Sequence, residues 1–440
     1  MTSRCGFFCI SPSLLDISDA LFEYNSEMSV ITSDSDKLRE IIAIDSELNK
    51  IQDQDILLER ILSVARRITN ADAGSIYIKR DNNLDIKYAQ NDTLQKDLDP
   101  GQKLIYKFFT LPVNSKSIAG YCASEKKLLN IPDYYGIPKD APYSHNAKYD
   151  KDAGYLSKSM LAIPLLNNMG ACLGVLQIIN KMDDEGELIA FTNEDEQLVR
   201  HFAVNVVIAL EKAQMTRAIL QRMVQMAELR DPKETGPHVN RVAGFSVELY
   251  DRWAFKMGIP EHKRNKDRDI FRMASMLHDV GKVGISDTIL KKPGRFDEDE
   301  YSIMKSHTLI GARLFRDSQS EFDQVAQTVV LNHHENWDGT GYPGHIDLDT
   351  GNALKTDEDG RVLGKKGTEI PVFGRIVAIA DVYDALRCKR VYKEAWKEED
   401  VLEEIRKLSG TKFDPDLVDI FFEVYDRLQT VADQYPDESE

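Results

Sequence analysis

The chain has 440 residues and a net charge of −17, with 42% hydrophobic and 29% charged residues. This balance is typical of a globular protein with apolar cores, and the length favours at least two domains. The negative charge argues against a protein that binds nucleic-acid polymers through their phosphates. No apolar run approaches the roughly 18 residues that a membrane-spanning helix needs. Five scattered cysteines indicate a reducing compartment, so we predict a cytoplasmic protein that binds no membrane.

Residues 1–37 predict an N-terminal tail, and residues 38–212 predict a domain of helices and strands. The segment that begins at Leu38 has the hydrophobic periodicity of helices with charged faces. Residues 73–90 are typical of two strands around an Asp-Asn-Asn turn. Residues 157–181 are typical of two more strands, joined by Asn-Asn-Met-Gly. The order of helix, hairpin, loops and hairpin favours an α+β fold.

A long helix is predicted after the second hairpin. Thr192 or Asn193 can serve as its N-cap, and acidic residues in the first turn complement the helix dipole. No glycine or proline interrupts the chain before Pro232, so the helix should continue as a linker over residues 199–230. A parallel homodimer would bury one apolar stripe of this helix; the alternative is a single amphipathic helix packed on its own domain. The stripe consists of Leu210, Ala213, Leu220, Val224 and Ala227, interrupted by Arg217.

The first domain resembles a GAF domain. Asn180-Lys181, Phe191 and Asp195-Glu196 are similar to the NKxxF…DE signature of GAF domains that bind cyclic nucleotides, with the spacing stretched by residues 183–190. The resemblance implies that Lys181 pairs with Asp195 and that both, with Asn180, brace a pocket for a small molecule or a cyclic nucleotide. The alternative is a surface loop followed by an ordinary helix start.

Histidine and carboxylate residues collect in short segments of the second half. Imidazole and carboxylate ligands without cysteine suit iron, manganese or zinc. A carboxylate directly after a histidine, as at Asp279, can bridge two cations. On a helix, the adjacent His333 and His334 would diverge by about 100° and could each take a different metal ion. The candidate ligands are Glu234, His238, His278, Asp279, His307, His333, His334 and Asp381.

Two spacings add to this pattern. Lys282 follows His278 by one helical turn, so its ammonium group should return to the same face. Glu234 and His238 would also lie one turn apart on a helix, although Pro237 is equally suited to a first turn that leaves Glu234 just ahead of it. A single buried histidine is usually a hydrogen-bonded core residue, but that explanation does not account for the whole ordered set.

The set closely resembles the HD-GYP family of the HD phosphohydrolase superfamily, over residues 230–425. The resemblance implies that residues 231–440 form an all-helical phosphodiesterase domain, which linearises the bacterial second messenger cyclic di-GMP to pGpG and in some members continues to GMP. It implies two or three iron or manganese ions, with Glu234 and His238 at the third. It also implies catalytic roles for Asp279, as a bridging ligand, and for Lys282, on the phosphate or the leaving oxygen.

The Gly-Tyr-Pro loop of that family is intact within residues 339–343. Its glycines permit close approach of the backbone, and the tyrosine can stack on the ligand or hydrogen-bond to it. A long segment, residues 345–374, follows where the family has a short connection, and its turn residues predict an extra hairpin or a flap. An R-x-Y-K element further on resembles the family's phosphate grip; the alternative is a solvated helix end. The implied substrate contacts are Lys282, Gly341, Tyr342, Arg390 and Lys393.

We therefore predict a multi-domain protein in which a long helix joins an α+β GAF sensor to an all-α HD-GYP domain. Its predicted function is metal-dependent hydrolysis of cyclic di-GMP, by a homodimer. One alternative is a hydrolase of another cyclic dinucleotide. A second is a catalytically silent module that binds such a molecule, and a third is a general nucleotide phosphohydrolase, against which the intact loop argues. The metal, the final product and the direction of regulation stay open at this level.

Overall fold

The computed structural model describes residues 44, 46–106, 108–114, 116–146, 150–151, 154–228, 236–388 and 396–436. Its contacts divide the chain into two units, residues 1–50 and 51–440, and every element named below lies in the second unit. The predicted tail, Glu234, Arg390 and Lys393 lie outside the described residues. None of the described helices combines the length and the apolar character required to cross a bilayer.

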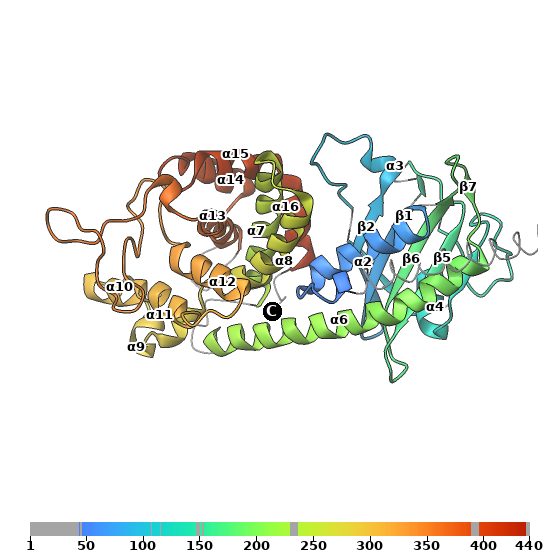
Figure 1. The fold of residues 1–440 in the computed structure, drawn as a ribbon, viewed down its shortest axis with the longest axis horizontal. Helices are drawn as coiled ribbons and strands as arrows, with labels where there is room; N and C mark the ends of the chain where they lie inside the picture. Colours follow the sequence, from blue (N-terminus) through green and yellow to red (C-terminus); the bar gives the residue numbers. More distant parts are fainter. Residues whose placement is uncertain are drawn as a thin grey trace, which may run out of the picture. The chain divides into compact units, whose positions relative to one another are not determined.

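An antiparallel sheet of seven strands forms the centre of the first domain (Figure 1). Its strands are β1 (Ala71–Arg80), β2 (Asn83–Asn91), β3 (Thr110–Pro112), β4 (Leu129–Ile131), β5 (Met160–Leu166), β6 (Cys172–Met182) and β7 (Leu188–Ile189). The order is β3-β2-β1-β6-β5-β4, with β7 paired to β6. Both predicted hairpins are confirmed as β1–β2 and β5–β6, and their inner strands pair with each other.

Helices cover both faces of this sheet. They are α2 (Gln54–Ile68), α3 (Asp92–Gln95), α4 (Ile118–Glu125) and α6 (Asn193–Glu228). Tyr77 and Val175 are partners in the β1–β6 register and pack with Cys122 of α4. Because side chains alternate along a strand, their neighbours Ile76 and Leu176 point to the opposite face, the side on which α2 and α6 pack. The mixed fold predicted from the hairpins is therefore confirmed.

The long helix is present as α6, a single element of 36 residues. The hydroxyl of Thr192 accepts a hydrogen bond from the Asp195 backbone N–H at 3.2 Å, so Thr192 is the cap. The assignment of the apolar stripe to a dimer interface is wrong. Leu210 and Ala213 are 0% exposed, and Leu220 and Val224 are also buried, all by packing within this chain. Sequence periodicity identifies an apolar face but does not say which surface covers it.

The second domain is built mainly from helices in its described part. Its helices are α7 (Gly236–Lys256), α8 (Glu261–Ser275), η1 (Val280–Gly284), α9 (Asp287–Leu290), α10 (Glu298–Lys305), α11 (His307–Arg313), α12 (Glu321–Asn332), η2 (Gly367–Glu369), α13 (Val372–Arg387), α14 (Glu398–Lys407), α15 (Pro415–Glu423) and α16 (Tyr425–Gln434). Helices α7, α8, α12 and α13 contact one another and share one apolar core. The tyrosine and phenylalanine rings of Tyr383 and Phe245 meet in it, with centroids 5.0 Å apart.

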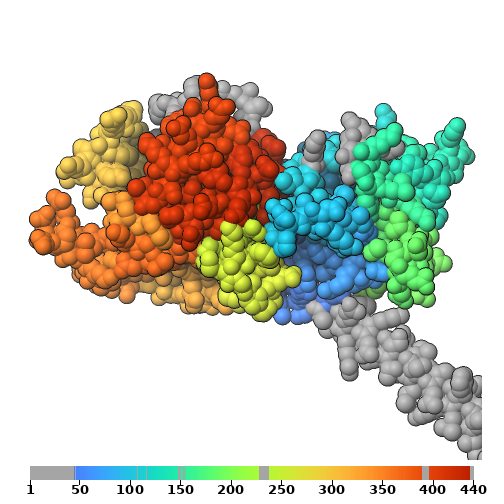
Figure 2. Space-filling model, turned by 90° about the horizontal axis from the view of Figure 1, so that it is seen from above, coloured from blue at the N-terminus to red at the C-terminus, as the bar shows by residue number. Residues whose placement is uncertain are grey.

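Charged side chains join the helical domain to α2 and to the loop before β3. Arg268 of α8 lies 2.7 Å from Glu59 of α2, and Lys103 lies 3.0 Å from Asp251 of α7. Figure 2 shows the region around residue 250, in yellow-green, against the blue and cyan atoms of the first domain. Burial alone would raise the pKa of Glu59, but attraction to Arg268 and Lys103 outweighs it and lowers this pKa to about 2. These pairs are therefore ionic at neutral pH.

The segment after the Gly-Tyr-Pro loop forms short turns rather than long strands. Isolated antiparallel bridges join Ile346 to Ala353 and Thr356 to Val362. The His345 backbone N–H donates to the Leu363 carbonyl at 2.9 Å, which ties the start of the segment to its middle. The segment is thus a compact double turn.

Candidate metal centre

Seven of the eight predicted ligands converge in the described part of the helical domain. Most of them come from helix ends: His278 and Asp279 lie between α8 and η1, His307 begins α11, and His333 follows α12, whereas Asp381 lies inside α13. The structure brings their ligand atoms together in two groups, each within 4.8 Å: Asp279, His307, His333 and His334; and His238, His278 and Asp381. The eighth predicted ligand, Glu234, lies outside the described residues.

Asp279 lies between the two groups. Its Oδ1 is 3.1 Å from His307 Nε2 and 3.4 Å from His333 Nε2, whereas its Oδ2 is 3.4 Å from His278 Nε2. Lys282 Nζ lies 2.8 Å from the same Oδ2. One carboxylate oxygen thus faces each group, the arrangement that a carboxylate bridging two cations requires.

Backbone carbonyls fix the orientation of three of the rings. The Nδ1 atoms of His278, His307 and His333 lie 3.0, 2.7 and 3.0 Å from the carbonyl oxygens of the residues three positions earlier. A carbonyl accepts only from an N–H, so Nδ1 carries the hydrogen and Nε2 keeps its lone pair. Such a bond from the second nitrogen is the usual support of a metal-binding histidine. All three rings therefore keep an acceptor lone pair at Nε2.

The predicted divergence of His333 and His334 is wrong. Their ring centroids are 4.1 Å apart and the ring planes are tilted by only 41°. Helix α12 ends at Asn332, so the angular spacing of a continuous helix does not apply to the two residues that follow it. Both histidines belong to the same group of potential ligands, and His334 lies beside the ring of Tyr342, with centroids 4.8 Å apart.

Asp384 supports the second group, and we did not assign it a role from the sequence. Its Oδ2 lies 2.8 Å from His238 Nδ1, and Arg241 donates to Oδ1 at 2.6 Å. His238 Nε2 then faces Asp381, 3.7 Å away. Burial would raise the pKa of Asp384, but hydrogen bonds from His238 and Arg241 lower it instead. The D-x-x-D spacing in α13 was the available signal, because it puts Asp384 one turn after Asp381.

The charges of the site favour an anionic Asp279 and a neutral His334. Burial acts to raise the pKa of Asp279, but Lys282 and His278 outweigh it and hold this pKa well below its usual range. Burial lowers the pKa of His334, and repulsion by His333 and His307 adds to the effect. A charged carboxylate among unprotonated imidazoles is the state that binds a cation.

Orphaned atoms show that the site fits a metal ion. The Nε2 atoms of His307 and His333 and the Oδ1 atom of Asp279 are buried and make no hydrogen bond with another described group. Buried polar atoms are normally satisfied, so lone pairs that converge in this way require a cation. Imidazole with carboxylate, and no thiolate, suits divalent iron, manganese or zinc.

Glu335 anchors the Gly-Tyr-Pro loop and is a second functional residue that the sequence reasoning missed. Its carboxylate accepts from the Gly344 N–H at 2.6 Å and from the Lys365 N–H at 3.2 Å. A Cβ on Gly341 would lie 2.2 Å from the Asn336 backbone nitrogen, so only glycine fits there. The loop is thereby folded against the end of α12, and Tyr342 is presented beside the histidines.

The three residues of the GAF signature brace a loop of the first domain. Lys181 Nζ lies 2.5 and 2.7 Å from the two carboxylate oxygens of Asp195, as the resemblance implied. Asn180 is 1% exposed, and its amide donates to the Leu156 carbonyl at 2.7 Å and to the Tyr155 hydroxyl at 2.8 Å. These bonds hold β6, the start of α6 and the preceding loop together. Their predicted part in a ligand pocket stays a prediction.

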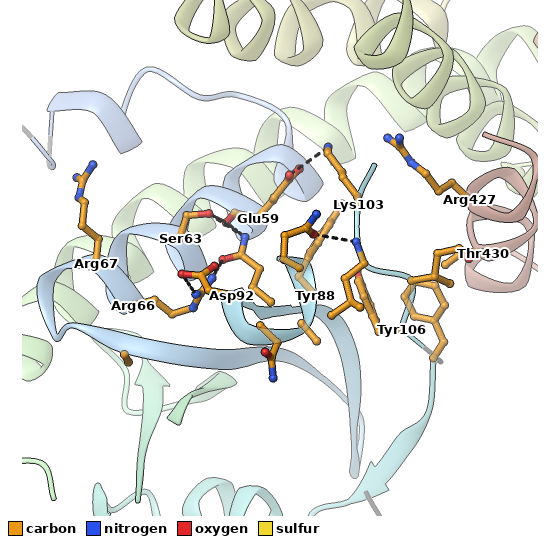
Figure 3. A pocket seen from close by; sticks show the side chains of 18 of the residues that line it. Glu59, Ser63, Arg66, Arg67, Tyr88, Asp92, Lys103, Tyr106, Arg427 and Thr430 are labelled. Carbon is orange, nitrogen blue, oxygen red and sulfur yellow. Dashed lines mark hydrogen bonds and ion pairs between the residues drawn. The ribbon is translucent and has the colours of Figure 1, made fainter. Parts of the chain in front are cut away.

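A cavity of about 630 Å³ lies away from both histidine groups (Figure 3). Figure 3 shows Arg66, Lys103 and Arg427 around it, from α2, the loop before β3 and α16. Arg66 lies 2.6 Å from Asp92, Lys103 lies 3.3 Å from Glu59, and Arg427 contacts Glu248. Each of these three cations therefore has an acidic partner already.

Comparison with known families assigns both halves of the chain. Residues 53–210 match the family model of the GAF domain, and residues 235–386 match that of the HD domain. Relatives that are 36% identical include the "3′3′-cGAMP-specific phosphodiesterase 2" of Vibrio cholerae serotype O1, over 53% of this chain and 39% of that protein. The "Cyclic di-GMP phosphodiesterase response regulator RpfG" of Xanthomonas campestris pv. campestris is another, over 51% and 52%. A third is the "Cyclic di-GMP phosphodiesterase" of Thermotoga maritima, over 50% and 52%. This chain therefore spans about half of these relatives' length, or less.

Proposed function

We propose that this chain, which carries a GAF domain followed by an HD domain, hydrolyses a cyclic dinucleotide with metal ions held by the HD domain. The observation that supports the proposal best is the position of Asp279, with one carboxylate oxygen toward each histidine group. Fold alone does not establish chemistry, but this ligand geometry is suited to hydrolysis of a phosphodiester.

The proposed ions are iron or manganese. His307, His333 and His334 would hold one ion, and His278, His238 and Asp381 a second, with Asp279 between them. Such ions, when bound, lower the pKa of a water molecule and stabilise negative charge on phosphate oxygens. The sequence also predicts a form of the site that holds a third ion, with Glu234 as one of its ligands.

The residues of the chain would bind and orient the substrate. Lys282 is one turn beyond Asp279 and can shift its ammonium from Oδ2 to a phosphate oxygen of the substrate. Tyr342 lies beside His334 and can stack on a base or donate its hydroxyl. Lys305 Nζ is 5.9 Å from the centre of the Tyr342 ring, so it adds positive charge at the same side. Arg390 and Lys393 are proposed as a further phosphate grip.

Cyclic di-GMP is the proposed substrate. The second candidate is 3′3′-cGAMP, because a relative is named as a phosphodiesterase specific for it. The two share the phosphodiester ring and differ in one base. Purified chain that retains its metal should be incubated with each dinucleotide at equal concentration, and the products identified by chromatography. Faster loss of cyclic di-GMP supports the proposal, and a preference for the adenine-containing ring supports the second candidate. No turnover of either by metal-loaded protein would favour a silent binding module.

Regulation by the GAF domain through α6 in a homodimer is the last part of the proposal. The face of α6 turned away from the chain carries large apolar side chains at steps of three, four and seven. They are Val204, Ile208, Met215, Ile219, Met223 and Met226, between 40% and 67% exposed. An exposed apolar stripe of this length is unusual on a monomer, and the same stripe on a second copy is its natural complement. The two α6 helices would then connect both sensors to both HD domains.

A further inference from the structure

A second cavity, of about 490 Å³, lies where β1, β2 and α6 meet the first turn of α7. None of the seven described metal ligands lines it. Its volume is within the range of small-molecule sites. Lys87 of β2, Arg80 of β1 and Arg217 of α6 all reach it, so three cations from three elements share one space.

Lys87 is the unusual member of this set. The residue is only 6% exposed, and its ammonium makes no hydrogen bond or ion pair with any residue that the structure describes. A charged side chain that is mostly covered by protein is normally paired with an opposite charge. Burial lowers the pKa of Lys87, and repulsion by Arg80 lowers it further. The side chain therefore lines the cavity without an ion-pair partner among the described residues.

The acidic groups nearest to Lys87 are already engaged. Asp55 lies 2.8 Å from Arg217, accepts from the Tyr435 hydroxyl at 2.7 Å and contacts Arg272. These two arginines outweigh burial and hold the pKa of Asp55 well below its usual range, so its charge is satisfied. Asp85 accepts from the Thr110 hydroxyl at 3.0 Å and lies 3.5 Å from Arg80. Neither carboxylate is within ion-pair distance of Lys87.

The start of a helix also lines the cavity. Pro237, Val239 and Asn240 from the first turn of α7 line it, and α7 has 21 residues. The N-terminal end of a helix carries partial positive charge and N–H groups that bind anions. The amides of Gln214, Gln221 and Gln225 from α6 also line the cavity, as does the carboxylate of Asp55, which is paired with Arg217 and Arg272.

We propose that this cavity is a binding site for a phosphate monoester about as large as a nucleoside monophosphate. Its dianionic phosphate would lie between Lys87, Arg80 and the start of α7, and the glutamine amides would meet the rest of the molecule. The proposed site is separate from the metal centre, but the two sites are connected through the first turn of α7. His238 is the neighbour of Val239 in the same helical turn, so a ligand that orders this turn also orders a metal ligand.

The test is ligand-induced thermal stabilisation of the full chain in phosphate-free buffer. Guanosine 5′-monophosphate should raise the unfolding midpoint by a few degrees, and guanosine, which lacks the phosphate, should not. Lys87→Met keeps an apolar stem of similar length and should abolish the shift while the variant stays folded. Lys139→Met, at an exposed position in another loop, is the matched control and should retain the shift.

A second variant separates the two sites at which a phosphate could bind. Asp279→Ala disables the metal centre but leaves the cavity intact, so it should retain the shift. Arg80→Gln, at a largely exposed side chain that can be replaced without unfolding the sheet, should weaken calorimetrically measured binding by about tenfold. The proposal is overturned if the wild-type chain shows no shift. It is also overturned if Lys87→Met keeps the shift and Asp279→Ala loses it, because binding would then belong to the metal centre.

Discussion

The carboxylate of Asp384 lies 2.8 Å from Nδ1 of His238 and turns the other nitrogen of this ring toward Asp381. Arg241 donates to the same carboxylate, so the support is itself held in place. A metal-binding histidine needs such a partner, because the partner selects the tautomer and fixes the ring plane. Asp384 is therefore expected to control metal binding without touching the metal.

The first prediction follows from this pair. Asp384→Asn should lower metal content and phosphodiesterase rate by about 10- to 100-fold, because the amide no longer favours an N–H at Nδ1 of His238. Metal analysis and rate should both be measured, with added manganese restoring part of the rate. Asp419→Asn changes an exposed aspartate on α15 and should leave both quantities unchanged. Full metal content in Asp384→Asn would contradict the assigned role.

Glu335 carries the second prediction. Glu335→Ala removes the acceptor for the Gly344 and Lys365 N–H groups and should loosen the Gly-Tyr-Pro loop. We expect kcat/KM to fall about tenfold, chiefly through a higher KM, with metal content preserved. Glu358→Ala, at the exposed tip of the following segment, is the control. Loss of metal in Glu335→Ala would mean that this residue supports the ligands rather than the loop.

The third prediction concerns pH and the contact between the two domains. The folded-state pKa of Glu59 is about 2, below its ordinary value of 4.5, so its contribution to stability is present above pH 4.5 and is lost as the pH falls toward 2. The loss is at most about 3 kcal/mol, from 1.36 kcal/mol per pKa unit. Denaturant unfolding across this window should show it, with a shallower pH slope in Glu59→Gln. An identical slope in both proteins would exclude Glu59 as the cause.

The fourth prediction tests the homodimer. Met215→Glu combined with Ile208→Glu puts charges into the exposed stripe of α6 and should convert a dimer to a monomer in analytical ultracentrifugation. The mass should then no longer depend on concentration. Met169→Glu, at a turn residue that is 92% exposed, makes the same chemical change away from α6 and should remain dimeric. A wild-type chain that is already monomeric at micromolar concentration would refute the dimer.

Local sequence patterns predicted the helices and strands well. The contacts between them depend on the geometry of the folded chain. The hairpins of β1–β2 and β5–β6 follow from turn residues and alternation, and the candidate metal ligands follow from residue types at motif spacing. The covered face of α6 could not be predicted, because Leu210 and Val224 belong to an apolar face that several surfaces could bury. The relation of His333 to His334 depended on where α12 ends, which a helical pattern locates only to within a turn. Glu335 and Asp384 act through contacts made only in the folded chain.

The central claim is that Asp279, between the two histidine groups, holds the metal ions that hydrolyse a cyclic dinucleotide. The most direct measurement is the turnover of cyclic di-GMP by anaerobically purified chain of known metal content, alongside Asp279→Ala. We predict linear pGpG or GMP from the wild-type chain at two or more metal ions per chain, and a rate at least 1,000-fold lower with reduced metal in the variant, on the order expected for loss of a metal-centred step. An Asp279→Ala chain that keeps its metal and the full rate would contradict the account.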